Sequence, residues 1–191
     1  MRRFGAVLAL LLVAASCGRQ DVRILSEEEL PEDIYGSPVP SPTASIDLPE
    51  TGVVYLVREG RLARETLRLP GEGVAQSLPA ALLLALFTGP QADRRVHSAI
   101  PPGTLLNEVT VEGGIASVDV TAAFEQGGKE EVLALRVAQV VYTLTEPPTD
   151  ITQVEIFING ESTLIPGAAG QSLLRPVSRA DYRRFAPHDG G

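Results

Sequence analysis

The stretch EVTVEGGIASVDV, residues 108–120, decides the fold, because apolar and polar side chains alternate on both sides of a Gly-Gly pair. Two adjacent glycines suit the two-residue turn of a β-hairpin, in which both central residues need a positive φ. A turn at Gly113 and Gly114 fixes the register of the two strands. The predicted cross-strand pairs are Glu112 with Ile115, Val111 with Ala116, Thr110 with Ser117, Val109 with Val118, and Glu108 with Asp119.

The predicted hairpin separates its side chains into two faces. The apolar face holds Val109, Val111, Ala116, Val118 and Val120. The polar face holds Glu108, Thr110, Ser117 and Asp119. This separation is typical of a sheet that is covered on one side only. We therefore expect helices on the apolar face and an open polar face.

A second hairpin is predicted at Asn159-Gly160, a strong two-residue turn signal. The strand before it directs Val154, Ile156 and Ile158 inward and Gln153, Glu155 and Phe157 outward. Outward side chains of the two hairpins form the candidate interaction face, which consists of Glu108, Thr110, Ser117, Asp119, Glu155 and Phe157.

Two helices and a further strand pair complete the expected fold. Ser77 caps a helix over residues 78–88 that Gly89-Pro90 stops. Apolar residues recur at helical spacing over residues 130–144, until Pro147-Pro148. Within that helix, Gln139 and Tyr142 are expected as interior polar groups that bond to the backbone. Residues 53–57 and 62–69 are predicted to pair as strands. The predicted class is α/β (α+β), a single domain with two helices packed on one face of a mixed sheet with two β-hairpins.

The predicted register sets Glu108 directly opposite Asp119, and like charges in that position are destabilising. Two explanations are open. An arginine such as Arg58 or Arg68 on a neighbouring strand neutralises the pair, or the polar face docks a basic or polar patch on another protein.

The N-terminus has the pattern of an export signal. Arg2 and Arg3 precede 12 apolar residues, 4–15, followed by Ser16 and Cys17. As a helix the run spans about 18 Å, whereas a membrane-spanning helix must cross about 30 Å of hydrocarbon. Cys17 follows Ala14-Ala15-Ser16, which resembles the lipobox of bacterial lipoproteins. We expect a signal peptide over residues 1–16 and a lipid on Cys17; the alternative is a secreted protein with a free thiol.

Residues 17–50 are expected to form an acidic, proline-rich tether without a fold, followed by a domain over residues 51–182 and a disordered tail over 183–191. The whole chain has 191 residues and a net charge of −8, which argues against nucleic acid as a partner. We expect the lipid on Cys17 to hold the domain outside the cytoplasm, anchored to the cell membrane.

No catalytic residues, metal site or cofactor are predicted. The two histidines, His97 and His188, do not form a cluster. Gly127-Gly128-Lys129 lacks the Ser or Thr of a phosphate loop, and residues 170–174 lack the last glycine of a nucleophile elbow. Glu130-Glu131 more naturally charges a helix start than cleaves a glycan, although a cell-wall hydrolase is kept as a third hypothesis.

Six short pieces, taken in order, resemble the GerMN domain of sporulation and germination lipoproteins over residues 52–182. They are Val54-Tyr55-Leu56-Val57, Leu86-Phe87-Thr88-Gly89-Pro90, Ala99-Ile100-Pro101-Pro102-Gly103-Thr104, Val118-Asp119-Val120-Thr121, Ala138-Gln139-Val140-Val141-Tyr142-Thr143-Leu144-Thr145, and Ile158-Asn159-Gly160. The resemblance implies a compact, non-enzymatic module similar to ring-building domains, which assembles with an envelope or spore-assembly protein. A binding domain for a small envelope ligand is the alternative.

Overall fold

The computed structural model describes residues 47–71, 73–90 and 95–187. The expected signal peptide, Cys17 and most of the expected tether lie outside these residues. Within the described part, no helix combines the length and apolar character needed to cross a bilayer.

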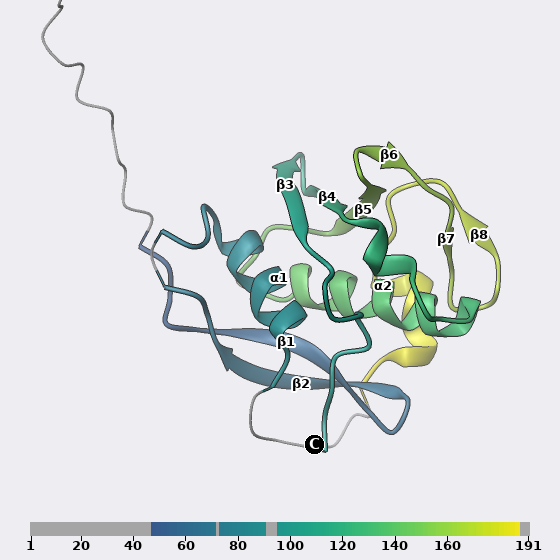
Figure 1. Ribbon diagram of the computed structural model, residues 1–191, viewed down its shortest axis with the longest axis horizontal. Coiled ribbons are helices and arrows are strands. Elements are labelled where there is room, and N and C mark those ends of the chain that lie inside the picture. The colour runs from purple at the N-terminus through teal and green to yellow at the C-terminus, as the bar shows by residue number, and fades with distance from the viewer. Residues whose placement is uncertain (1–46, 72, 91–94, 188–191) are drawn as a thin grey trace, which may run out of the picture. The chain divides into compact units, whose positions relative to one another are not determined.

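Short strands and helices alternate along the domain (Figure 1). In chain order they are β1 (Thr51–Arg58), β2 (Arg61–Arg68), α1 (Leu78–Thr88), β3 (Leu106–Glu112), β4 (Ile115–Val120), the 3₁₀ helix η3 (Ala122–Glu125), α2 (Glu130–Leu144), β5 (Gln153–Ile158), β6 (Glu161–Ser162), β7 (Ile165–Pro166), β8 (Ser172–Leu173) and the 3₁₀ helix η4 (Arg179–Phe185).

The main sheet has the strand order β3-β4-β5-β6. β3 and β4 form the predicted hairpin with the predicted register, including Glu108 opposite Asp119. Gly113 and Gly114 have φ values of 56° and 80°, as the tight turn requires. β5 lies parallel to β4, and β6 returns antiparallel to β5 through Asn159 and Gly160. The expected mixed sheet with two hairpins is confirmed.

β1 and β2 pair with each other, as predicted, but they form a separate two-stranded sheet. The two helices lie between this sheet and the main sheet (Figure 1). The apolar side chains of β4 and β5 face the helices and are buried, as Val118, Val154 and Ile156 illustrate. Helices therefore cover one face of the main sheet, in agreement with the alternating sequence.

Both helices begin and end close to the predicted residues. Ser77 Oγ accepts a hydrogen bond from the Ala80 backbone N–H at 3.3 Å, which caps α1. Gly89 ends α1 with a φ of 69°, and its N–H donates to the Ala85 carbonyl oxygen at 3.0 Å. α2 starts at Glu130 and is buried almost continuously from Ala134 onward.

Polar side chains of α2 bond to the edge of β1. Gln139 is 0% exposed; its Nε2 donates to the Tyr55 carbonyl oxygen at 2.9 Å, and its Oε1 accepts from the Ala99 N–H at 2.8 Å. Thr143 Oγ1 accepts from the Tyr55 N–H at 3.0 Å. The expectation that Gln139 bonds to the backbone is confirmed. These contacts satisfy the buried backbone groups of Tyr55, while Val57, two residues further along the same side of β1, forms a β-bridge with His97.

The C-terminal segment packs back onto the domain. The Ser178 N–H donates to Asp181 Oδ2 at 2.9 Å at the start of η4. Tyr182 is buried, and its hydroxyl donates to the Pro166 carbonyl oxygen at 3.1 Å. η4 continues to Phe185, whose ring is also buried, so the folded chain extends three residues past the expected end of the domain at 182.

Replacing Gln139 with leucine is predicted to lower the free energy of unfolding by about 2–4 kcal/mol, because the Tyr55 carbonyl and the Ala99 N–H lose their partners without regaining water. Urea denaturation followed by circular dichroism measures the change. The control is Gln126→Leu, at an exposed loop position, which is expected to change stability by less than about 0.5 kcal/mol. An equally small effect of Gln139→Leu would contradict this account of the contact.

Candidate interaction face

The structure brings all six predicted interaction residues together on the outer face of the main sheet. Cross-strand pairing makes two adjacent rows of three: Thr110, Ser117 and Glu155 in one row, and Glu108, Asp119 and Phe157 in the other. Residues that pair across neighbouring strands share a face, so the two rows form one continuous surface. We call these six residues the outer face.

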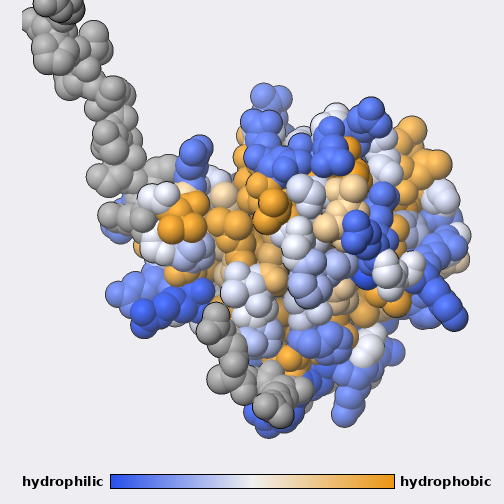
Figure 2. Space-filling view, in the orientation of Figure 1, coloured by the Kyte–Doolittle hydropathy of each residue, from blue (hydrophilic) through white to orange (hydrophobic). Residues whose placement is uncertain are grey.

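The outer face is accessible. Glu108 and Thr110 on β3 are exposed, and the four residues on β4 and β5 are half-buried. Figure 2 shows hydrophilic residues over the end of the β3–β4 hairpin. The ion pairs between described residues use the carboxylates of Glu65, Glu131, Glu146 and Asp181. None of those pairs includes Glu108, Asp119 or Glu155, so the outer face keeps a net negative charge.

The structure corrects the expected source of neutralisation for Asp119. Arg58 and Arg68 belong to the separate β1–β2 sheet and do not lie on a strand next to β3 or β4. Arg58 instead pairs with Glu65 at 2.7 Å. Asp119 accepts hydrogen bonds from Asn107 Nδ2 at 3.1 Å and from the Gly160 N–H at 2.8 Å. Neutral donors therefore hold the Asp119 carboxylate beside Glu108.

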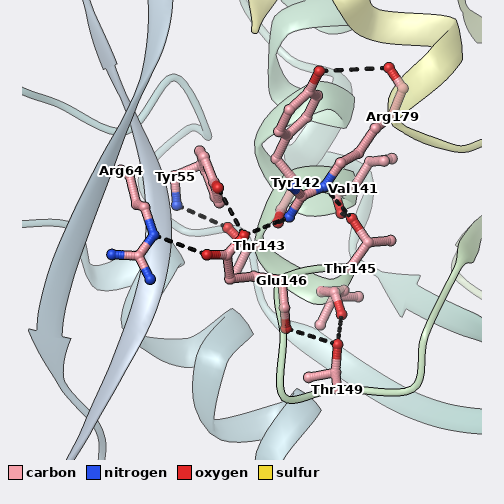
Figure 3. Close-up of polar contacts among 10 residues, drawn as sticks. Tyr55, Arg64, Val141, Tyr142, Thr143, Thr145, Glu146, Thr149 and Arg179 are labelled. Carbon is pink, nitrogen blue, oxygen red and sulfur yellow. Dashed lines mark hydrogen bonds and ion pairs between the residues drawn. The ribbon is translucent and has the colours of Figure 1, made fainter. Parts of the chain in front are cut away.

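A second polar cluster, which sequence reasoning missed, surrounds Glu146 just after α2 (Figure 3). Glu146 Oε2 accepts from the Tyr55 hydroxyl at 2.8 Å and from Arg179 Nη2 at 2.7 Å. Its Oε1 accepts from Arg64 Nε at 2.8 Å. These four residues, which we call the Glu146 cluster, join β1, β2, α2 and η4.

Arg179 makes further contacts within and beside the Glu146 cluster. Its guanidinium carbon lies 4.9 Å from the ring centre of Tyr142 and 5.4 Å from that of Tyr55. Its Nη2 also donates to the Tyr142 carbonyl oxygen at 2.9 Å, and its Nε donates to Thr145 Oγ1 at 2.8 Å. A cation at the carboxyl end of α2 is favourable, because that end carries partial negative charge.

The hydrogen bonds to Glu146 affect its pKa more strongly than its burial does. Burial alone would raise the pKa of this carboxyl group, but the donors from Arg179, Arg64 and Tyr55 lower the pKa to about 2. Burial, followed by the hydrogen bond to Glu146, raises the pKa of the Tyr55 hydroxyl. The carboxylate is ionised at neutral pH and already accepts three hydrogen bonds. The cluster is therefore suited to fastening the C-terminal segment rather than to proton transfer.

The described surface also has a groove of about 610 Å³ between β2 and α1. Its apolar lining includes Leu67, Leu69, Val74 and Leu84, and its polar lining consists of Arg68 and Thr88 among the described residues. Among the residues placed by the structure, no group of three His, Cys, Asp or Glu side chains is arranged to hold a metal ion.

Residues 39–163 match the family model described as "Germane: Sporulation and spore germination". No curated protein matches the chain.

Solved structures with a similar fold include the following three. The first GerMN domain of the sporulation protein GerM from Bacillus subtilis has 26% identity and a TM-score of 0.55, with 68% of this chain and 98% of that chain covered. The tandem GerMN domains of the same protein give 25% identity and a TM-score of 0.55, covering 69% of this chain and 46% of that chain. A Clostridium perfringens protein described as a candidate lipoprotein shares the fold, with 15% identity, a TM-score of 0.50, and 73% and 93% coverage.

The Glu146 cluster predicts a specific pH dependence. The pKa of Glu146 in the folded protein, about 2, lies below its ordinary value of 4.5. The ionised carboxylate therefore stabilises the fold fully above about pH 4.5, and this stabilisation is lost as the pH falls toward 2. Glu146→Gln is expected to lower the free energy of unfolding by about 2 kcal/mol at pH 7, and the difference from wild type should shrink between pH 5 and pH 3.

Urea denaturation at pH 7, 5, 4 and 3 measures this difference. Glu65→Gln is the matched control, since Glu65 pairs only with the half-exposed Arg58 and is expected to contribute less than about 0.5 kcal/mol. A constant difference between Glu146→Gln and wild type over the whole pH range would contradict the assignment.

Proposed function

The chain belongs to the Germane family of sporulation and spore germination proteins, and on this premise we propose that it is a non-enzymatic interaction module of a sporulation, germination or cell-envelope complex. The outer face is the proposed contact surface. The observation that carries the proposal is the contrast between the two faces of the main sheet: helices cover one, while the other holds carboxylates that enter no ion pair with described residues.

The charge of the outer face defines the partner. Glu108, Asp119 and Glu155 lie on adjacent strands in a continuous surface, with the half-buried ring of Phe157 among them. A protein with a basic or polar patch and a few apolar side chains complements this surface. Opposite charges steer such a partner to the face and set its orientation.

We also propose that the domain works outside the cytoplasm, anchored to the cell membrane through lipid on Cys17. The support is the N-terminal sequence, in which two arginines and an apolar run precede the sole cysteine. Two acyl chains anchor a protein stably, whereas one chain binds only marginally. The acidic, proline-rich segment after Cys17 would keep the domain away from anionic lipid.

A binding domain for a small envelope ligand is the second candidate, and the groove between β2 and α1 favours it. The groove is large enough for a small ligand and mostly apolar, as many ligand sites are. Among its described lining residues, however, only Arg68 and Thr88 have polar side chains that could orient a ligand. The outer face, with six aligned side chains, therefore supports the protein-interaction role better.

The anchor is tested by labelling cells with palmitate. Full-length wild type is expected to incorporate the label and to sediment with membranes, whereas Cys17→Ala should lose both properties. Ser16→Ala is the control, since it keeps the cysteine and a small residue before it. Absence of label on the wild-type chain would overturn the anchoring proposal.

The outer face is tested with a double variant, Glu108→Gln together with Glu155→Gln. Asp119 is left unchanged, because its carboxylate bonds to Asn107 and Gly160 within the domain. Crosslinking in native membranes and mass spectrometry first identify the protein bound to wild type. The affinity of the double variant for that protein should fall about 5–20-fold, with a melting temperature within about 2 °C of wild type.

Glu59→Gln together with Glu125→Gln is the matched control, at exposed positions away from the outer face. This control should keep full affinity. Unchanged binding by the Glu108/Glu155 variant would contradict the proposed surface. A large loss of its stability with binding intact would show instead that these carboxylates serve the fold.

A further inference from the structure

β3 forms one edge of the main sheet, and the side of β3 away from β4 pairs with no strand of the described residues (Figure 1). All seven of its residues are exposed or half-buried. The one irregularity of the β3–β4 ladder lies near Asn107, so residues 108–112 are a regular strand. Natural edges are commonly blocked by lysine or proline, and β3 contains neither.

The register shows which backbone groups of β3 point outward. A two-residue turn makes Glu112 and Ile115 a hydrogen-bonded pair, so Glu112, Thr110 and Glu108 direct their backbone groups toward β4. The other side of β4 agrees with this alternation. The Val120 carbonyl oxygen accepts from the Asn159 N–H at 2.9 Å, and the Gly114 carbonyl oxygen accepts from the Thr152 N–H at 2.8 Å.

The even-numbered residues of β4 thus bond toward β5, and the odd-numbered ones bond toward β3. It follows that the N–H and C=O groups of Val109 and Val111 point away from the sheet. They offer two donors and two acceptors at the spacing that an added strand needs.

The side chains beside this edge select the chemistry of the added strand. On the same side of the sheet as the outer face lie the carboxylates of Glu108 and Glu112, both exposed. On the inner side lie Val109, half-buried, and Val111, which is 44% exposed. A strand that alternates basic and apolar residues would place its basic side chains by the carboxylates and its apolar side chains over the valines.

We propose that the partner of this domain adds a strand of alternating basic and apolar residues to the free edge of β3, pairing with Val109 and Val111. The inference rests on the proposed function, since it specifies how the main sheet binds a protein. Main-chain hydrogen bonds supply affinity, and the alternating side chains supply specificity.

A second copy of this chain fits the edge less well. If Val109 of one copy pairs with Val111 of the other, Glu108 lies opposite Glu112 at both ends of the paired segment. Like charges directly opposite each other are destabilising. The two glutamates therefore favour a basic strand from another protein over self-association.

The test uses the full chain in mild detergent and the fluorescent probe peptide acetyl-KVKVKVK-amide, with binding followed by anisotropy. Val111→Pro removes an outward N–H that β4 does not use, so the hairpin keeps its ladder. Its affinity for the probe should fall at least about tenfold. Val111→Thr, which keeps the N–H and the β-branched shape, should stay within about threefold of wild type. Both variants should melt within about 3 °C of wild type.

A second probe, methylated on the backbone nitrogen of its central valine, separates strand addition from charge attraction. Its charge is unchanged, but it should bind wild type about tenfold more weakly. Equal affinity of the two probes, equal affinity of Val111→Pro and Val111→Thr, or no binding of the probe by wild type would overturn the inference. So would a dimer of wild type, seen by light scattering, that Val111→Pro dissociates.

The two proposals fail separately. If Val111→Pro binds the identified native partner normally while the Glu108/Glu155 double variant does not, the edge inference is wrong and the outer face stands. If only Val111→Pro loses that partner, the edge stands and the outer face does not.

Discussion

The domain depends on a buried polar contact between α2 and the edge of β1. The backbone N–H and C=O of Tyr55 would lie buried without partners if Thr143 and Gln139 did not bond to them at 3.0 and 2.9 Å. Unpaired buried groups are costly, so this contact restricts how α2 lies against β1. With that side of α2 committed to β1, its other apolar side chains pack toward the main sheet. The helices then occupy one face of that sheet and leave the outer face accessible.

The ion pairs of the Glu146 cluster hold the C-terminal segment and the β1–β2 sheet against α2. The Glu146 cluster draws β1, β2 and η4 onto the end of α2, and the guanidinium of Arg179 lies by two tyrosine rings. The carboxylates of the outer face take no part in this cluster. Asp119 is held by neutral donors, and Glu108 and Glu155 enter no ion pair between described residues. The carboxylate that stabilises the fold in the Glu146 cluster is therefore a different residue from the carboxylates of the outer face, which we propose bind a partner.

Local patterns made much of this structure predictable. The two hairpins could be predicted from Gly113-Gly114 and Asn159-Gly160, and the two faces of the sheet from the alternation of apolar and polar residues. The ends of α1 could be predicted from Ser77 and Gly89. What escaped prediction depends on contacts distant in sequence. Tyr55 and Glu146 are 91 positions apart, and no spacing rule connects them. The Gly160 donor to Asp119 was missed because it reaches the carboxylate only through the parallel pairing of β4 with β5. The separate β1–β2 sheet also could not be deduced, since strand patterns do not specify which sheet a hairpin joins.

The chain belongs to the Germane family and is similar to a GerMN domain of a sporulation protein. Our proposal adds that its surfaces, rather than a reaction centre, carry its role. The most direct test of that claim is photo-crosslinking in native cells with a benzophenone amino acid at Thr110, on the outer face, or at Gln76, an exposed position before α1. The account predicts a specific crosslinked protein from Thr110 and none from Gln76. Crosslinks from Gln76 alone would contradict it, because they would put the partner at the start of α1 and away from the outer face.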